Sequence, residues 1–196
     1  MTAKPVFGLV LAGGQSRRMG RDKALLQHDG QSQLAHMVAV LDGVVDQVFV
    51  SARRDQADDS ERSRFELIID AYDDMGPVAG ILSALQAHPQ ADWLVVACDL
   101  PNIDQATLEF LLQHRSATQP FTAFRSSHDD LPEPLCAIYT AGSDNLLQEF
   151  VEQGLVCPRK MLIRSDTLLL TQPNPQSLDN VNTPDDLSNS VLGAAS

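Results

Sequence analysis

The chain has 196 residues, enough for one α/β domain to bury a sizeable core without disulfide or metal staples. Its formal charge of -12 and isoelectric point near 4.6 argue against a general nucleic-acid or membrane-surface binder, because both partners are polyanions and would repel it. We therefore expect small-molecule partners that meet a local positive pocket.

In the first half of the chain, short apolar runs alternate with segments of helical period. In chain order the pattern predicts a strand at 6–11, a helix at 33–41, strands at 48–51 and 65–70, a break at Gly76-Pro77, a helix at 78–87, a strand at 93–98 and a helix at 104–114. The run at 93–98 is almost continuously apolar, which is typical of a parallel sheet covered on both faces. Asp104 stands at a helix-capping position.

The second half is less regular. It predicts strands at 121–124 and 135–139, a helix at 143–153 that Gly154 ends, a strand at 168–171, a loop at 172–176 and a final helix that starts at Thr183. The prolines at 132–136 are expected to fix the shape of a loop before the strand. Because no repeat or linker is evident, we expect one domain over 1–192 and a frayed tail at 193–196.

The three cysteines are Cys98, Cys136 and Cys157. They lie far apart, form no C-x-x-C pair and have no histidines at ligand spacing, so neither a disulfide framework nor a zinc site is expected. The N-terminus leads directly into the first strand, and no window reaches the length of a membrane span. We therefore expect a cytoplasmic protein with reduced, mostly buried cysteines.

The most informative segment is 9–23, where an apolar strand leads into a glycine pair, two arginines, a third glycine, an arginine and Lys23. Glycines let backbone N–H groups approach an anion closely, and the cations compensate several phosphate charges, so the segment predicts a triphosphate site. It is not a P-loop, because Lys23 does not directly follow Gly20, and it lacks the dinucleotide fingerprint. The alternative is a surface turn with solubilising arginines.

In an open parallel sheet the ligand lies at the carboxyl ends of the strands. Those ends carry Ser51, Asp70 and Asp99. Asp99 follows a nearly pure hydrophobic run and is the first candidate for holding Mg²⁺, which prefers oxygen ligands and usually takes one or two carboxylates. The alternative for Asp99 is a turn or cap before the following helix.

Five motifs and Lys23 occur in order along almost the whole chain: LAGG at 11–14, RMG at 18–20 followed by Lys23, GPVAG at 76–80, CDLP at 98–101 and NVNTPD at 180–185. This combination resembles the molybdenum cofactor guanylyltransferase family of nucleotidyltransferases. The resemblance implies a Rossmann-like three-layer α/β sandwich around a mostly parallel sheet, of the nucleotide-diphospho-sugar transferase type. It also implies transfer of GMP from Mg-GTP to molybdopterin, with release of pyrophosphate.

The resemblance also implies roles for individual residues. Arg18, Lys23 and Asp99 would be catalytic, with Asp99 as the ligand of Mg²⁺. The nucleotide-binding residues would be Leu11, Ala12, Gly13, Gly14, Lys23, Ser51, Asp70, Gly76, Gly80 and Asp99. The acceptor-binding residues would be Pro134, Arg159, Lys160 and Asn182. Arg159 and Lys160 could equally be surface charges, and Asn182 a turn residue before the Thr183 cap.

Alternatives to this function stay open. Ser51 stands where the best-matching guanylyltransferases have an asparagine, so a cytidylyltransferase or another NTP transferase with a different phosphorylated acceptor is the second hypothesis. A non-catalytic nucleotide-binding module is the third. Under the first hypothesis, molybdoenzymes or their chaperones are candidate protein partners, and neither nucleic acid nor a membrane is expected.

Overall fold

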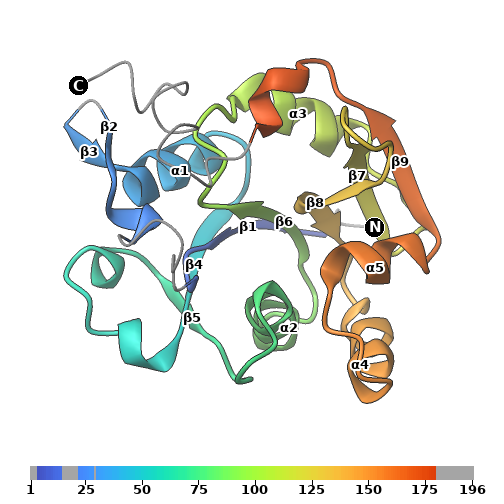
Figure 1. The fold of residues 1–196 in the computed structure, drawn as a ribbon, viewed down its shortest axis with the longest axis horizontal. Coiled ribbons are helices and arrows are strands. Elements are labelled where there is room, and N and C mark those ends of the chain that lie inside the picture. Colours follow the sequence, from blue (N-terminus) through green and yellow to red (C-terminus); the bar gives the residue numbers. More distant parts are fainter. Residues whose placement is uncertain (1–3, 15–21, 29, 180–196) are drawn as a thin grey trace.

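The computed structural model describes residues 4–14, 22–28 and 30–179 (Figure 1). The strands are β1 (Val6–Leu11), β2 (Gln27–His28), β3 (Gln31–Ser32), β4 (Gln47–Ala52), β5 (Leu67–Ile69), β6 (Asp92–Ala97), β7 (Phe121–Arg125), β8 (Pro132–Tyr139) and β9 (Thr167–Thr171). The α-helices are α1 (Gln33–Asp42), α2 (Pro77–Ala87), α3 (Gln105–Gln113), α4 (Asp144–Glu152) and α5 (Pro158–Ile163). Short 3₁₀ helices are η1 (Lys23–Leu25), η2 (Arg54–Gln56), η3 (Arg62–Arg64) and η4 (Pro175–Leu178).

Seven strands form one sheet in the order β5-β4-β1-β6-β8-β7-β9, and β2 and β3 form a separate hairpin. The pairs β1–β4, β1–β6, β4–β5 and β7–β9 are parallel, whereas β8 is antiparallel to both β6 and β7. Reversing β8 alone leaves the carboxyl ends of β1, β4, β5 and β6 at one edge. The predicted mostly parallel α/β architecture is therefore confirmed.

Helices cover both faces of the sheet, with α1 and α3 on one side and α2, α4 and α5 on the other (Figure 1). Successive residues of a strand point to opposite faces, so Trp93 and Val95 belong to the core beneath α2, while Leu94 and Val96 belong to the core beneath α1 and α3. This explains why β6 is apolar from Trp93 to Ala97: all six residues of the strand, including the polar Asp92 at its start, are buried.

Local signals locate most helix ends. Asp104 accepts a hydrogen bond from the Thr107 N–H at 2.7 Å and caps α3, as predicted. Gly76 precedes the first residue of α2 with a φ of 54°, a conformation that favours glycine. Gly154 has a φ of 77° and follows α4, which confirms the predicted end of that helix.

The structure corrects several predicted elements. The predicted strand at 65–70 is only Leu67–Ile69, because Phe65 ends η3. The prolines expected in a loop at 132–136 lie within β8: Pro132 pairs with Arg125 of β7, and the pairing of β8 with β6 begins only at Cys136. Proline is tolerated there because that part of β8 lacks a neighbour on the β6 side.

Other elements were not predicted at all. Helix α5, the β2–β3 hairpin and the four 3₁₀ helices have too few residues to show an apolar period. Among them, η4 lies partly inside the expected loop at 172–176. The expected final helix and the tail at 193–196 lie outside the described residues, and the single-domain expectation stays a prediction.

Candidate nucleotide-binding site

A cavity of about 760 Å³ lies at the carboxyl ends of β1, β4, β5 and β6. Eight of the residues predicted to bind nucleotide line it. They are Leu11, Ala12, Gly13, Gly14, Ser51, Asp70, Gly76 and Asp99. The strand-end rule thus brings together residues that are up to 88 positions apart in the sequence, although their binding role stays a prediction.

Backbone hydrogen bonds continue beyond the strands and fix the starts of the loops around the cavity. The Ala12 N–H donates to the Ser51 carbonyl at 3.2 Å, and the Asp70 N–H donates to the Ala52 carbonyl at 2.9 Å. On the other side of β1, the Cys98 N–H donates to the Leu11 carbonyl at 3.3 Å. These hydrogen bonds fix the position of the backbone at Leu11 and Ala12, directly before the glycine pair Gly13-Gly14.

Ser51 and Asp70 form a polar pair on the floor of the cavity. The Ser51 hydroxyl donates to Asp70 Oδ1 at 2.8 Å. Burial raises the pKa of Asp70, because desolvation penalises the charged carboxylate, while the Ser51 hydrogen bond and the charge of Arg53 act in the opposite direction. A half-buried carboxylate with spare acceptor capacity is suited to accept N–H or O–H groups of a nucleoside.

Gly80 supports this pair without lining the cavity. It lies on α2, and a Cβ built on it would stand 2.2 Å from Ser51 Oγ and 3.0 Å from Leu11 Cδ2. Glycine is therefore required for α2 to approach β4 and β1 this closely. In the structure Gly80 sets the spacing between α2 and the strands β4 and β1, and its implied contact with the nucleotide stays a prediction.

Asp99 follows β6 and is half-buried at the edge of the cavity. The described lining of the cavity carries six aspartates and two arginines. The aspartates offer carboxylate oxygens, the hard ligands that Mg²⁺ prefers. Within the described part of the chain no group of three or more His, Cys, Asp or Glu residues is arranged to hold a metal ion. One or two carboxylates plus phosphate oxygens are a usual set for Mg²⁺, so these residues fit that ion.

The sequence analysis missed several lining residues. Arg53 and Arg54 follow β4, and Tyr72, Asp73, Asp74 and Met75 connect β5 to α2. Arg53 is held in place because its Nη1 donates to the Gly13 carbonyl at 2.7 Å and its Nε to Asp55 Oδ1 at 2.9 Å. Arg53 stands at the same strand end as Ser51, two residues further on, but no role is predicted for it from its position in the chain.

Of the residues predicted to bind the acceptor, the three that the structure describes, Pro134, Arg159 and Lys160, do not line the cavity. Arg159 lies on α5 and donates to Asp129 at 2.8 Å and to Glu133 at 3.0 Å, and Lys160 is exposed on the same helix. Pro134 is buried in β8, and its carbonyl accepts a hydrogen bond from the Tyr139 hydroxyl at 2.9 Å. The next residue, Leu135, does reach the cavity.

Three predicted site residues receive little or no structural description. Arg18 and Asn182 lie outside the described residues. For Lys23 only the backbone is described, at the start of η1. The cysteines behave as expected of buried hydrophobes: Cys98 and Cys136 are buried, and burial raises the pKa of the Cys136 thiol far above its ordinary value. No helix among the described residues has the length and apolar character needed to cross a membrane.

Comparison with known families identifies this arrangement. The model of a MobA-like NTP transferase domain matches residues 8–167. The chain belongs to this family. That membership confirms the resemblance derived from the motifs and makes the chain an NTP transferase by family.

Individual relatives of this MobA-like domain agree. A molybdenum cofactor guanylyltransferase from Pseudomonas aeruginosa is 33% identical over 188 residues, which cover 94% of each chain. A molybdenum cofactor biosynthesis bifunctional protein from Synechocystis is 36% identical over 182 residues. These are 93% of this chain but 52% of that protein, so the chain spans about half of that relative's length.

A solved structure has the same fold. Molybdopterin-guanine dinucleotide biosynthesis protein A from Archaeoglobus fulgidus superposes with a TM-score of 0.78 at 25% identity, over 93% of this chain and 95% of that one. The seven-stranded sheet and its flanking helices are therefore those of this MobA-like transferase fold.

Proposed function

We propose that this MobA-like domain transfers GMP from GTP to molybdopterin, forming molybdopterin guanine dinucleotide and pyrophosphate, with Mg²⁺ as its metal cofactor. The observation that carries the proposal is the shared cavity: Gly13, Asp70 and Asp99 come from three strands and meet at one edge of the sheet. The relatives named molybdenum cofactor guanylyltransferase support the choice of GMP and of the acceptor.

The proposed reaction is an in-line displacement at the α-phosphorus of GTP. A terminal phosphate oxygen of molybdopterin forms the new bond to the α-phosphorus. The bond from that phosphorus to the oxygen that bridges to the β-phosphate breaks, and pyrophosphate leaves with the electron pair. The attacking phosphate is already anionic, so the residues must position the reactants and neutralise charge, and no general base is needed.

Roles follow from position. The backbone N–H groups of Gly13 and Gly14 would bind phosphate oxygens, and Asp70 with Ser51 would hold the nucleoside. Lys23 and Arg18 would stabilise the charge that grows on the departing pyrophosphate. Asp99 would hold Mg²⁺, which would neutralise negative charge on the phosphates.

The charge of the lining supports the requirement for a divalent cation. Six aspartates and two arginines make the described lining negative, and the proposed Arg18 and Lys23 would offset only part of this charge. Nucleotide bound to a divalent cation carries less negative charge and gains a direct bond to a carboxylate. This balance predicts that nucleotide binding depends steeply on Mg²⁺.

The acceptor would enter from the side of β8, because the residues after β1, β4 and β5 occupy the nucleotide side. Leu135 of β8 lines the cavity there. Arg159 lies on α5, which packs against β8. Binding of an acceptor phosphate by Arg159 would require competition with Asp129 and Glu133. Molybdoenzymes and their chaperones are the proteins that would receive the product.

The test is incubation of the purified protein with Mg²⁺, molybdopterin and each of the four nucleoside triphosphates in turn. We expect pyrophosphate release and dinucleotide formation with GTP, and neither when the metal is removed with a chelator. Turnover with CTP and not GTP would refute the guanine assignment. Nucleotide binding without transfer to molybdopterin would instead favour a different phosphorylated acceptor or a binding module.

A further inference from the structure

Arg62 is a charged residue that the proposed chemistry leaves unused. It lies in η3, within the connection between β4 and β5, and only 1% of it is exposed. Arg62 is not among the described residues that line the cavity. A buried guanidinium is costly unless its donors are paired, which makes its partners informative.

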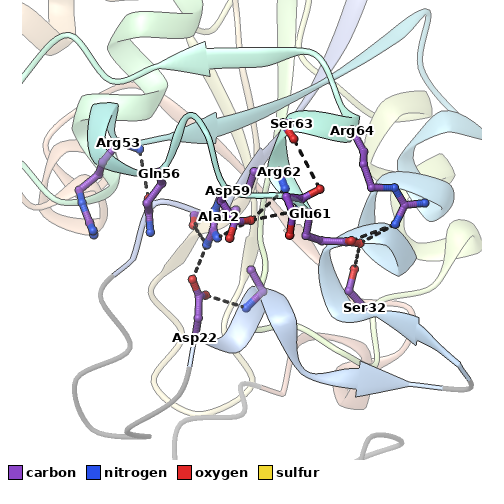
Figure 2. A network of polar contacts seen from close by, with 12 residues as sticks. Ala12, Asp22, Ser32, Arg53, Gln56, Asp59, Glu61, Arg62, Ser63 and Arg64 are labelled. Carbon is purple, nitrogen blue, oxygen red and sulfur yellow. Dashed lines mark hydrogen bonds and ion pairs between the residues drawn. The ribbon is translucent and has the colours of Figure 1, made fainter.

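Two of those partners, Ala12 and Asp22, stand in the sequence directly before and after residues 13–21, which we call the glycine loop (Figure 2). Nε and Nη2 of Arg62 donate to the Ala12 carbonyl at 3.3 and 2.8 Å, and Nη2 also donates to Asp22 Oδ2 at 2.6 Å. On its other side, Nη1 lies 3.4 Å from Asp59 Oδ1. One planar guanidinium therefore joins the residue before the glycine pair to the residue before Lys23.

The bond to Ala12 sets the direction of a backbone donor. The described peptides contain no cis bond, and in a trans peptide the C=O and the N–H of the next residue point in opposite directions. With the Ala12 carbonyl held toward Arg62, the Gly13 N–H points away from Arg62. Arg53 holds the next carbonyl, that of Gly13, so the Gly14 N–H is directed in the same manner. Both glycines line the cavity.

The bond to Asp22 reaches the other flank of the loop. Asp22 Oδ1 accepts the N–H of Ala24 at 3.1 Å and so fixes the first turn of η1, which begins at Lys23. Neighbouring contacts brace the same connection: Glu61 accepts a hydrogen bond from Ser32, the cap of α1 (Figure 2). Arg62 thus contacts the residues on both sides of the glycine loop, Ala12 and Asp22.

We propose that Arg62 is a positioning residue for triphosphate binding: by holding Ala12 and Asp22 together, it presents the N–H groups of the glycine pair and the start of η1 to the phosphates. The inference deepens the proposed function and rests on it for the identity of the ligand. Lysine cannot replace this geometry, because its ammonium is a point charge without the planar fork that bonds a carbonyl and a carboxylate together.

The test compares Arg62→Lys with the matched control Arg64→Lys. Arg64 lies in the same 3₁₀ helix and is exposed, and its guanidinium binds Glu61, with no contact to Ala12 or Asp22. Calorimetry measures binding of Mg-GTP, inorganic pyrophosphate with Mg²⁺, and guanosine. We expect Arg62→Lys to weaken the binding of GTP and of pyrophosphate by about tenfold or more and to leave the binding of guanosine unchanged. In the control, the affinities for all three ligands should be unchanged.

A general loss of structure would give a different result. If Arg62→Lys weakens guanosine in proportion to GTP, or leaves GTP binding at the wild-type level, the inference is overturned. If circular dichroism shows that Arg62→Lys does not fold, the variant Asp22→Asn decides. This variant keeps the hydrogen bond between Arg62 and Ala12, and we expect the same selective loss of GTP and pyrophosphate affinity, but a smaller one. Equal losses for GTP and guanosine in Asp22→Asn would also overturn the inference.

The binding measurements separate this inference from the proposed function. Wild-type protein that binds Mg-GTP but transfers nothing to molybdopterin would refute the proposed function and leave the role of Arg62 intact. Full transfer activity together with unperturbed phosphate binding in Arg62→Lys would do the reverse. Absence of both GTP and pyrophosphate binding in the wild type would overturn the inference as well.

Discussion

Replacing Gly80 with alanine is expected to destabilise the protein. The new Cβ would stand 2.2 Å from Ser51 Oγ and 3.0 Å from both Ser51 Cβ and Leu11 Cδ2. Rotating the serine hydroxyl away relieves only the first of these contacts and breaks its bond to Asp70. The other two atoms, Ser51 Cβ and Leu11 Cδ2, lie on β4 and β1 of the sheet, so α2 has to move away from the sheet.

The magnitude follows from three opposing contributions. Overpacking of a well-packed interior costs about 1–3 kcal/mol. Loss of the Ser51–Asp70 hydrogen bond costs about 1 kcal/mol more. Alanine favours the helical conformation over glycine by about 1 kcal/mol, which offsets part of the loss. We therefore expect the free energy of unfolding to fall by about 1–3 kcal/mol.

The assay is urea unfolding of Gly80→Ala beside Gly14→Ala. Gly14 is the matched control, because its added Cβ would meet nothing within 4 Å and its stability should change by less than about 0.5 kcal/mol. In the background of Ser51→Gly the cost of Gly80→Ala should shrink, since two of the three close atoms are removed. Unchanged or increased stability of Gly80→Ala would refute the argument.

Three further predictions concern carboxylates. Asp99→Asn should lower the rate of pyrophosphate release by about a hundredfold or more while leaving thermal unfolding unchanged, and wild-type turnover would remove Asp99 as the metal ligand. Asp70→Asn should bind GTP more weakly yet be at least as stable at pH 7. The raised pKa means that the contribution of Asp70 to wild-type stability is most favourable in acid and falls as the pH rises through that pKa, so the stability of wild type relative to the variant should fall over the same range in urea titrations. For Glu61, the Ser32 hydrogen bond lowers the pKa, so the stability that wild type gains over Glu61→Gln at pH 7 should be lost as the pH falls through that lowered pKa; a difference independent of pH would contradict this.

The sequence predicted the sheet edge that carries the cavity better than it predicted strand β8. The strand at 6–11 has the predicted bounds because a continuous apolar run enters directly at a glycine pair, and both signals are local. Asp99 and Asp70 could be placed together because parallel strands end at the same edge. Strand β8 was shortened in the prediction because prolines usually exclude a strand, and only the register shows that Pro132 lacks a neighbour on the β6 side.

The connection between β4 and β5 could not be predicted for a different reason. Residues 53–64 carry many charges and no apolar period, a composition that is typical of a solvated loop. Its contacts are distant in sequence: Arg62 meets Ala12 across 50 residues and Asp22 across 40. No local pattern distinguishes a buried arginine from the exposed Arg64 two positions later.

Stability alone does not account for Arg62 at a buried position. Removing a guanidinium from water costs several kcal/mol, and well-packed apolar side chains of similar volume are often as stabilising as a buried ion pair. Its partners Asp22 and Asp59 are 27% and 28% exposed, so solvent weakens the attraction that would repay this cost. An apolar side chain could fill the same space, but it could not hold the Ala12 carbonyl and Asp22 in one plane. The position is explained by the geometry of the glycine loop, in the same way that Gly80 is explained by the closeness of α2 to Ser51.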